Sequence, residues 1–193
     1  DEAVFEVGRN VAAPAGQVVF ENDLFQLIEY TPLTERVHAR PLLFVPPSIN
    51  KYYILDLQPD NSLVRFSVEQ GHRTFVVSWR NPDASMGHLT WDDYVQDGVI
   101  RAMEVVRDIA ARRSDGTINT LGFCVGGTLL ANALAVLQAR GEQFAHSATL
   151  LTTMVDFTDT GVLSVYVDEA SVALREATLG KGGLMTGREL ASA

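Results

Sequence analysis

The chain has 193 residues, of which 47% are apolar and 20% charged, and its 24 acidic and 15 basic side chains give a net charge of −9. At about 150 residues per domain, this length predicts roughly one domain. The apolar content is sufficient for a hydrophobic core and excludes a disordered chain. The acidic balance argues against nucleic-acid binding, because phosphate contacts need clustered Lys and Arg.

The single cysteine, Cys124, excludes an intrachain disulfide and a cysteine-rich zinc site, and it favours a reducing, cytoplasmic setting. The chain begins at Asp1 without a methionine or the basic and apolar segments of a signal peptide, so we expect it to be a piece of a longer protein. Its apolar runs are far shorter than the roughly 18 residues that span a bilayer. We therefore expect no transmembrane segment.

The first forty residues contain two extended runs, 17–21 and 24–30, joined by the polar residues 21–23. This pattern predicts an antiparallel hairpin. Residues 42–45 then form an apolar run without alternation, which is typical of a strand buried on both faces of a parallel sheet. Two prolines, Pro46 and Pro47, end that run.

The rest of the chain alternates between apolar runs and helical periodicity. Strands are predicted at 74–79, 118–123 and 148–155. Helices are predicted at 61–70, 90–111, 125–140 and 171–178, with a glycine-rich break at 180–183 and a further helix opening over 185–193. Strands that alternate with helices indicate right-handed crossovers and a parallel sheet, so the fold class is α/β.

The sequence GFCVGG at 122–127 lies between a predicted buried strand and a predicted helix. It has the form of a nucleophile elbow, G-x-nucleophile-x-G, with Cys124 in place of serine. The tight strand-to-helix turn needs small residues two positions before and after the nucleophile, and Gly122 and Gly126 occupy these positions. The sulfur would lie at the N-terminus of the following helix, which stabilises a thiolate.

An elbow of this kind also needs two backbone donors for an oxyanion. The N–H of Val125 is the expected first donor, because it opens the helix after Cys124. The second donor is expected from the loop 46–50 after the first parallel strand. Proline has no N–H, so Ser48 or Ile49 is the candidate, and Ile49 is slightly preferred.

Two other interpretations of these residues stay open. Cys124 could be a buried structural thiol, with the glycines serving a tight turn, since free cysteine is among the most buried residue types. A Rossmann phosphate loop is a weaker alternative, because its fingerprint needs a glycine where Cys124 stands.

A nucleophilic cysteine needs a base, normally a histidine oriented by a carboxylate. The predicted order of elements places His38, His72 and His146 at the amino edge of the sheet, away from the elbow. His88 follows a strand at the carboxyl edge, but the usual chain order in this fold is nucleophile, acid, histidine. The sequence therefore does not complete a triad.

Asp156 is the best local candidate for the acid, because it is predicted to lie just beyond the carboxyl end of the fourth parallel strand. It could equally cap the turn at Thr158, as aspartate in turns usually does.

Four segments together resemble the polyhydroxyalkanoate synthases, most closely the one-component type that uses short-chain monomers. They are INKYYILDL at 49–57, SWRNPDAS at 78–85, GFCVGGT at 122–128 and LLTTMVDF at 150–157. The resemblance extends from about residue 5 to the end of the chain. It implies an α/β-hydrolase core that polymerises (R)-3-hydroxyacyl-CoA into polyester and releases coenzyme A. It implies no metal and no separate cofactor, because coenzyme A is part of the substrate.

The resemblance also implies roles for individual residues. Cys124 would carry the growing chain as a thioester, Val125 would bind the oxyanion, and Asp56 would lie near the acyl-CoA path, with Ser48 as a further substrate-binding residue. The family's catalytic aspartate and histidine lie beyond Ala193, so we expect the chain alone to be inactive. Residues 1–158 would be the N-terminal part of the catalytic core and 159–193 the start of a mobile cap. A homodimer at the surface of cytoplasmic polymer granules is also implied.

Two alternative functions remain. A cysteine hydrolase of esters or lactones would differ only in that water, rather than a hydroxyacyl chain, attacks the thioester. A noncatalytic granule-coating protein could keep the same fold, although the presence of Cys124 argues against it.

Overall fold

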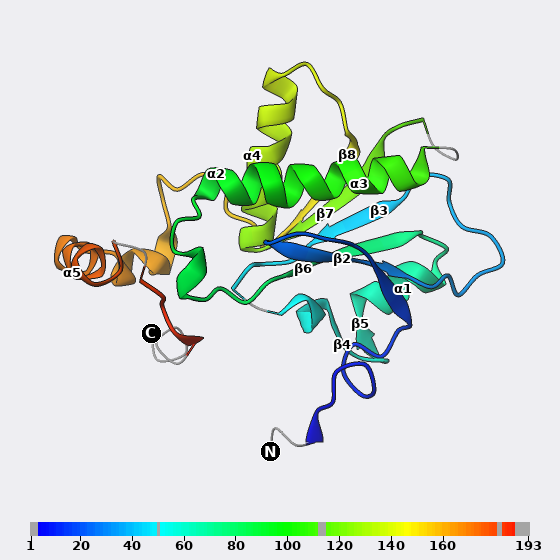
Figure 1. Ribbon diagram of the computed structural model, residues 1–193, viewed down its shortest axis with the longest axis horizontal. Helices are drawn as coiled ribbons and strands as arrows, with labels where there is room; N and C mark the ends of the chain where they lie inside the picture. The colour runs from blue at the N-terminus through cyan, green and yellow to red at the C-terminus, as the bar shows by residue number, and fades with distance from the viewer. Residues whose placement is uncertain (1–3, 50, 112–114, 181–182, 188–193) are drawn as a thin grey trace. The chain divides into compact units, whose positions relative to one another are not determined.

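The structure is a computed structural model that describes residues 4–49, 51–111, 115–180 and 183–187 (Figure 1). The chain divides into two compact units. The first unit consists of Asp1–Arg80 and Asp92–Met154, and the second of Asn81–Trp91 and Val155–Ala193. The break after Met154 comes slightly before the boundary predicted after residue 158, and the assignment of 159–193 to a cap stays a prediction.

A six-stranded sheet forms the centre of the first unit, in the order β1-β2-β6-β3-β7-β8. Strands β6, β3, β7 and β8 are parallel, whereas β2 is antiparallel to both β1 and β6. The predicted hairpin and the predicted parallel sheet are therefore confirmed. The strands are β1 (Gly16–Glu21), β2 (Phe25–Tyr30), β3 (Leu42–Val45), β6 (Thr74–Trp79), β7 (Ile118–Phe123) and β8 (Ala145–Leu151).

The strand register shows which side chains lie on each face of the sheet, and each face has its own layer of core. Phe44 pairs with Val76 on one side and Leu121 on the other, and these three side chains form a cluster with α1 (Leu63–Glu69). Gly122, the next residue after Leu121, faces the opposite layer and abuts Leu130 of α4 (Val125–Ala139). Figure 1 shows α1 on one side of the sheet and α4 with α3 (Arg101–Ala110) on the other.

The first predicted helix begins later than expected. Residues Asn61–Ser62 form the short strand β5, which pairs with β4 (Asp56–Gln58) after a 3₁₀ turn at Tyr52–Leu55. Helix α1 starts at Leu63 because the side chain of Ser62 accepts a hydrogen bond from the N–H of Arg65 at 2.8 Å and caps the helix.

The fourth parallel strand is displaced from its prediction. Strand β8 covers Ala145–Leu151 rather than 148–155, because it pairs with β7 from Ile118 opposite Ala145 to Phe123 opposite Leu151. The chain then leaves the sheet at Thr152, whose φ is +47°. Apolar residues continue beyond the strand at Met154 and Val155, so the sequence does not mark where β8 ends.

The predicted helix over 90–111 contains an unexpected segment. It consists of α2 (Trp91–Asp93), the π-helix η4 (Tyr94–Ile100) and α3. Within η4, Gly98 lies against the ring of Trp79, where an added Cβ would come within 2.9 Å of two ring carbons. Apolar spacing predicts a helix but does not distinguish a π-turn from an α-turn, so this detail was not predictable from periodicity.

The described residues of the second unit include two 3₁₀ turns and an eleven-residue α-helix. The turns are Ala84–Met86 and Gly161–Tyr166. Helix α5 (Glu169–Leu179) contains the predicted helix 171–178 and is capped by Asp168, which accepts a hydrogen bond from the N–H of Ser171. Most of the helix expected over 185–193, and part of the break at 180–183, lie outside the described residues.

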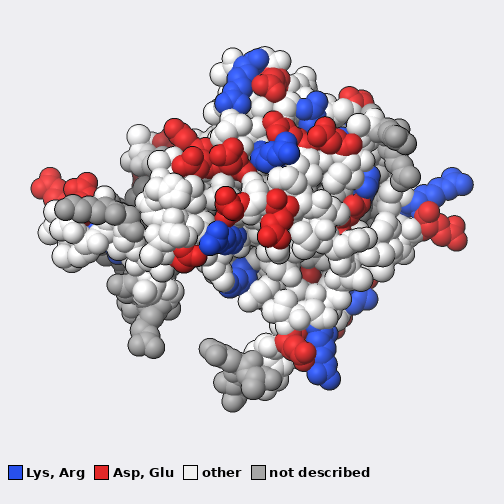
Figure 2. Space-filling view, viewed as in Figure 1, with Lys and Arg blue, Asp and Glu red and all other residues white. Residues whose placement is uncertain are grey.

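The described helices include none with the length and apolar character needed to cross a bilayer. On the face shown in Figure 2, the basic side chains of the described residues are dispersed among acidic ones and do not form a single patch.

Candidate active site

Cys124 occupies a strained turn between β7 and α4. Its φ and ψ are +55° and −129°, a conformation that residues other than glycine rarely adopt. Its N–H donates to the carbonyl of Leu151 at 3.0 Å, and its own carbonyl accepts the N–H groups of Gly127 and Thr128 at 2.9 and 3.2 Å. These bonds hold the strained residue in place, and strain of this kind is concentrated at functional sites.

Three glycines allow the turn to form. A Cβ on Gly122 would lie 2.4 Å from the Cα of Gly127, and one on Gly126 would lie 2.2 Å from the carbonyl oxygen of Val45. The requirement for small residues at these two positions is therefore confirmed. Gly127 is a third tight position, since a Cβ there would lie 2.0 Å from the hydroxyl of Thr153. The spacing of the elbow motif does not identify this glycine. The adjacent pair of glycines was the available signal.

The segment after β8 is held against α4 at the same place. The hydroxyl of Thr153 donates to the carbonyl of Leu151 at 3.0 Å, and the hydroxyl of Thr128 donates to the carbonyl of Met154 at 2.7 Å. Because Leu151 also accepts the N–H of Cys124, the elbow and this segment share one set of hydrogen bonds.

The two candidate oxyanion donors lie at the same edge of the sheet as Cys124. Val125 is the first residue of α4, where the backbone N–H has no intrahelical acceptor. Val45 pairs with Gly122, so the loop after β3 begins beside the elbow. In that loop Ser48 is partly buried and Ile49 is exposed, and among the described residues no acceptor is found for the Ile49 N–H. The predicted placement of Ser48 and Cys124 at one edge is confirmed.

Asp56 lies away from this turn, in the core beneath α1. It is 1% exposed, its Oδ1 accepts the hydroxyl of Ser62 at 2.6 Å, and Tyr30 also hydrogen-bonds to its carboxyl. Its Oδ2 is buried without a partner among the described residues. Burial raises the pKa of Asp56, and the bonds from Ser62 and Tyr30 oppose that shift. The structure therefore places Asp56 in the core, and a role near the substrate stays a prediction.

Three histidines of the first unit lie at the amino edge of the sheet, as expected. His38 and His72 precede β3 and β6, and their rings lie 4.9 Å apart, whereas His146 is the second residue of β8. Burial, and secondarily His38, lowers the pKa of His72. His88 belongs to the second unit, where its Nδ1 lies 3.0 Å from the carbonyl oxygen of Ser85.

Asp156 also belongs to the second unit and lies five residues after the end of β8, at Leu151, rather than directly after it. Its carboxylate accepts hydrogen bonds from the hydroxyl and the N–H of Thr158, which lower the pKa of Asp156. This is the turn-capping role that the sequence left open. No three metal-ligating side chains come together among the described residues.

Two sequence families match the chain. Residues 1–67 match the N-terminus of poly-beta-hydroxybutyrate polymerase (PhaC), and residues 41–184 match the alpha/beta hydrolase fold. The poly(3-hydroxyalkanoate) polymerase subunit PhaC of Cupriavidus necator is 64% identical over the whole chain. The polymerases of Methylorubrum extorquens and Rhizobium meliloti are 44% and 42% identical, also over the whole chain. The chain spans 33%, 31% and 31% of these three relatives, respectively.

Solved structures agree with the fold. An alpha/beta hydrolase enzyme from the metagenome of Lake Arreo superposes with a TM-score of 0.58 at 17% identity, covering 86% of this chain and 53% of that one. An esterase of Pyrobaculum calidifontis superposes with a TM-score of 0.56 at 16% identity, covering 91% of this chain and 60% of that one. At such low identity, these structures support the fold alone.

Proposed function

Because the chain belongs to the alpha/beta hydrolase family and is related along its whole length to poly(3-hydroxyalkanoate) polymerases, we propose that it is the nucleophile-bearing part of such a polymerase. The observation that carries the proposal is Cys124, held at φ +55° on an elbow whose glycines permit no side chain. The substrate would be (R)-3-hydroxyacyl-CoA, and the products a polyester and free coenzyme A.

In the first step, the Cys124 thiolate attacks the thioester carbonyl carbon of the substrate. A carbon–sulfur bond forms, and the carbonyl π electrons move to oxygen, where the N–H groups of Val125 and Ile49 receive the charge. When the carbonyl re-forms, coenzyme A leaves as a thiolate and the acyl group stays on Cys124. The positive end of α4 favours the attacking thiolate.

In the second step, the hydroxyl of another hydroxyacyl group attacks the Cys124 thioester. A carbon–oxygen bond forms, the carbon–sulfur bond breaks and a base removes the hydroxyl proton. Transfer of an acyl group from the sulfur of coenzyme A to the sulfur of Cys124 changes the free energy little, so the acyl group can still move on to a hydroxyl. A serine ester would hold the acyl group more firmly. We propose that the base and its carboxylate partner come from the part of the polymerase that is not matched by this chain, since the relatives are about three times as long.

The remaining parts of the proposal follow from the same relationship. Ser48 lies in the loop beside the elbow and would contact the substrate. Asp56 is buried, so it would influence the path of the acyl-CoA from the core without being exposed on its surface. The enzyme would work without a metal or separate cofactor, in the cytoplasm, at the surface of polymer granules and as a homodimer. The second unit would form part of a cap.

The test is a product analysis with 3-hydroxybutyryl-CoA. The 193-residue chain is assayed alone and then with the remainder of the Cupriavidus necator relative added as a separate polypeptide. Polymer and released coenzyme A, appearing only in the mixture and absent with Cys124→Ala, would support the proposal; Cys124→Ser should leave little activity. Free 3-hydroxybutyrate without polymer would instead indicate a hydrolase, and no product would favour a noncatalytic protein.

One further result would contradict the proposed source of the base. If the chain alone released coenzyme A rapidly, and replacing one of its four histidines abolished this release, the base would be local.

A further inference from the structure

Trp79 connects the loop that carries the second oxyanion donor to the rest of the fold. It is the last residue of β6, is 9% exposed, and donates its indole Nε1–H to the carbonyl oxygen of Pro46 at 2.8 Å. Pro46 is the first residue after β3, and both it and Pro47 are buried. The bond therefore joins the carboxyl ends of two neighbouring parallel strands.

The indole ring is fixed on several sides. Phe25 meets it edge-on with ring centroids 6.1 Å apart, and the ring of Tyr94 lies 5.6 Å away. Gly98 approaches so closely that an added Cβ would lie 2.9 Å from the outer ring carbons. Tyr94 and Gly98 both belong to the π-helix η4. The unexpected π-turn thus forms one wall of the indole site, and π-turns are frequent at functional sites.

The tip of the β1–β2 hairpin anchors the same π-helix. The side-chain amide of Asn22 donates to the carbonyl oxygen of Asp97 at 2.8 Å, directly before Gly98. The π-helix η4, which packs against Trp79, is therefore held by the hairpin as well as by its continuation into α3.

Pro46 is also confined from the side of the nucleophile. A Cβ on Gly126 would lie 2.4 Å from its carbonyl oxygen, so the backbone of α4 touches the same group that accepts the indole bond. Pro47 has a fixed φ and no N–H, so the orientation of the Pro46 carbonyl is passed through a stiff residue to Ser48 and Ile49.

We infer that Trp79 is a positioning residue for the oxyanion site: its indole N–H fixes the Pro46 carbonyl and thereby aims the N–H of Ile49 at the carbonyl bound to Cys124. The inference rests on the proposed active site, but it does not depend on which acyl group is transferred. A buried indole N–H needs an acceptor in any fold. Here the acceptor is the Pro46 carbonyl, which lies between the turn at Cys124 and the loop that carries Ile49, so the bond can also position that loop.

The test compares two reactions of the single cysteine, Cys124. Acylation by p-nitrophenyl acetate forms a carbon–sulfur bond, places charge on the carbonyl oxygen and expels p-nitrophenolate. Alkylation by iodoacetamide is a direct displacement of iodide that needs the thiolate but no oxyanion donor. The ratio of the two rate constants, relative to the same ratio for free cysteine, measures the oxyanion site alone.

Trp79→Phe removes the indole N–H and keeps an aromatic ring. Complete loss of an oxyanion donor costs about 10²- to 10³-fold in rate, so misaiming one should lower the acylation-to-alkylation ratio about 10-fold. The alkylation rate should stay within about twofold, because the helix N-terminus is unchanged. As the control, Val68→Ala opens the core beneath α1 and should leave the ratio unchanged.

A second variant separates aiming from packing. Phenylalanine lacks the outer indole carbons that approach Gly98, so Trp79→Phe combined with Gly98→Ala refills that space. We expect the double variant to regain folding stability without regaining the acylation-to-alkylation ratio. A ratio restored together with stability would show that Trp79 acts by packing alone and would overturn the inference.

Other results would also overturn the inference about Trp79. In Trp79→Phe, the acylation and alkylation rates could slow together, or neither could change. Alternatively, the parent chain could show the same acylation-to-alkylation ratio as free cysteine, which would mean that there is no oxyanion site to position. Failure of the chain and its relative's remainder to use 3-hydroxybutyryl-CoA would instead count against the proposed function, because p-nitrophenyl acetate does not test that substrate.

Discussion

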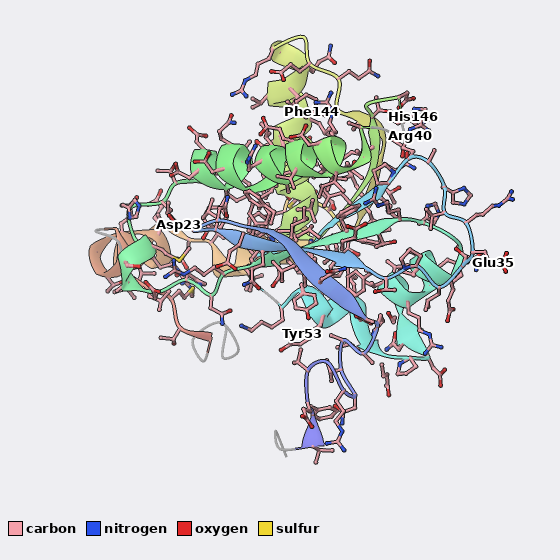
Figure 3. All side chains as sticks on the ribbon, turned by 45° about the vertical axis from the view of Figure 1, so that its right-hand side comes forward. Asp23, Glu35, Arg40, Tyr53, Phe144 and His146 are labelled. Atoms are coloured by element: carbon pink, nitrogen blue, oxygen red, sulfur yellow. The ribbon has the colours of Figure 1, made fainter. Side chains whose placement is uncertain are left out.

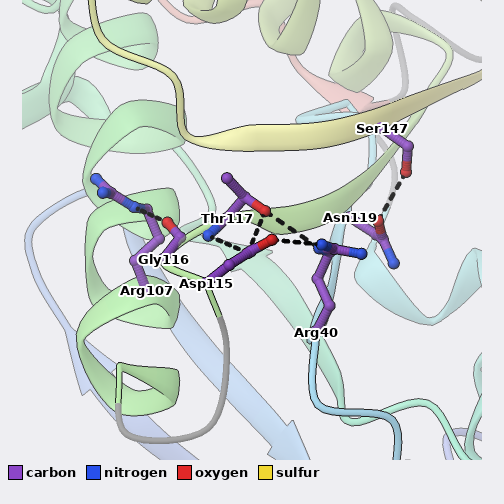
Figure 4. Close-up of polar contacts among 7 residues, drawn as sticks. All are labelled: Arg40, Arg107, Asp115, Gly116, Thr117, Asn119 and Ser147. Atoms are coloured by element: carbon purple, nitrogen blue, oxygen red, sulfur yellow. Dashed lines mark hydrogen bonds and ion pairs between the residues drawn. The ribbon is translucent and has the colours of Figure 1, made fainter.

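The two edges of the parallel sheet are held together in different ways. At the carboxyl edge, Cys124 and Thr152 have positive φ values, and backbone groups approach one another through positions where no side chain fits. At the amino edge, exposed and partly buried side chains make the connections (Figure 4). There Arg40 donates to Asp115 at 2.6 Å and to Thr117 at 3.1 Å.

The amino edge continues as a series of ordinary polar contacts. Arg107 donates to the carbonyl oxygen of Gly116 at 2.6 Å, and the hydroxyl of Ser147 donates to Asn119 at 2.9 Å. Figure 3 labels Arg40 and His146, both at this end of the first unit. Exposed ion pairs contribute little to stability, so the amino edge should tolerate changes that the carboxyl edge does not. The proposed chemistry lies at the carboxyl edge, where backbone strain is stored.

The largest effect is expected from Gly126→Ala at the carboxyl edge. The added Cβ would collide with the carbonyl oxygens of Val45 and Pro46, so the elbow must move. We expect Cys124 acylation by p-nitrophenyl acetate to fall at least about 100-fold, as when an oxyanion donor is lost. Overpacking should also lower the free energy of unfolding by about 1–3 kcal/mol. Stopped-flow acylation and urea denaturation measure the two effects.

Gly187→Ala is the matched control, because no atom of the described residues lies within 4 Å of the added Cβ. It should change the unfolding free energy by less than about 0.5 kcal/mol. If Gly126→Ala and Gly187→Ala changed the unfolding free energy and the acylation rate equally, the close approach at Gly126 would not be the cause of the effect.

An intermediate effect is expected from Asp56→Asn in the core beneath α1. Burial raises the folded-state pKa of Asp56, so the native protein binds a proton more tightly than the unfolded chain does. The stabilising contribution of this group is present below its unfolded pKa and is lost as pH rises through the folded pKa. The Asn variant should lack this loss, with a difference on the order of 1 kcal/mol at neutral pH.

Urea denaturation of both proteins from about pH 4 to about pH 8 gives that comparison. If the parent's unfolding free energy rose relative to that of Asp56→Asn as pH increased, the carboxylate would be better stabilised than its surroundings indicate.

The smallest effect is expected from Asp115→Asn at the amino edge. Hydrogen bonds from Thr117, and then from Arg40, hold the pKa of Asp115 well below its ordinary value. Its contribution to stability is present above the unfolded pKa and is lost as pH falls, which is opposite in sign to that of Asp56. We expect unchanged Cys124 acylation and, in the variant, a weaker loss of stability in acid. A change in acylation would show that the two edges are coupled.

Much of the first unit could be predicted from the sequence because its signals are local. The apolar run 42–45 leads directly to the observed strand β3. The helices predicted over 61–70 and 125–140 are each followed by a glycine, Gly71 or Gly141, that has a positive φ value. The elbow was predictable for the same reason, since Gly122 and Gly126 have a fixed spacing around Cys124.

What the sequence did not predict depends on contacts between distant segments. The end of β8 is set by its pairing with β7, and the tight fit of Gly127 depends on Thr153, which is distant in the chain. The burial of Asp56 requires Tyr30 and Ser62 to meet around it, which a motif alone does not specify. The π-turn beside Trp79 has no distinct apolar period.

Whether Cys124 carries the acyl chain is tested by the intact mass of the protein after it is mixed with 3-hydroxybutyryl-CoA and the remainder of the Cupriavidus necator relative. We expect this 193-residue chain to gain the mass of 3-hydroxybutyryl units on Cys124 and to lose them with hydroxylamine, as other thioesters do. The Cys124→Ala chain should gain none. Polymer formation by the Cys124→Ala chain, or acyl groups attached to any other residue while Cys124 stays free, would show that this elbow does not carry the acyl chain.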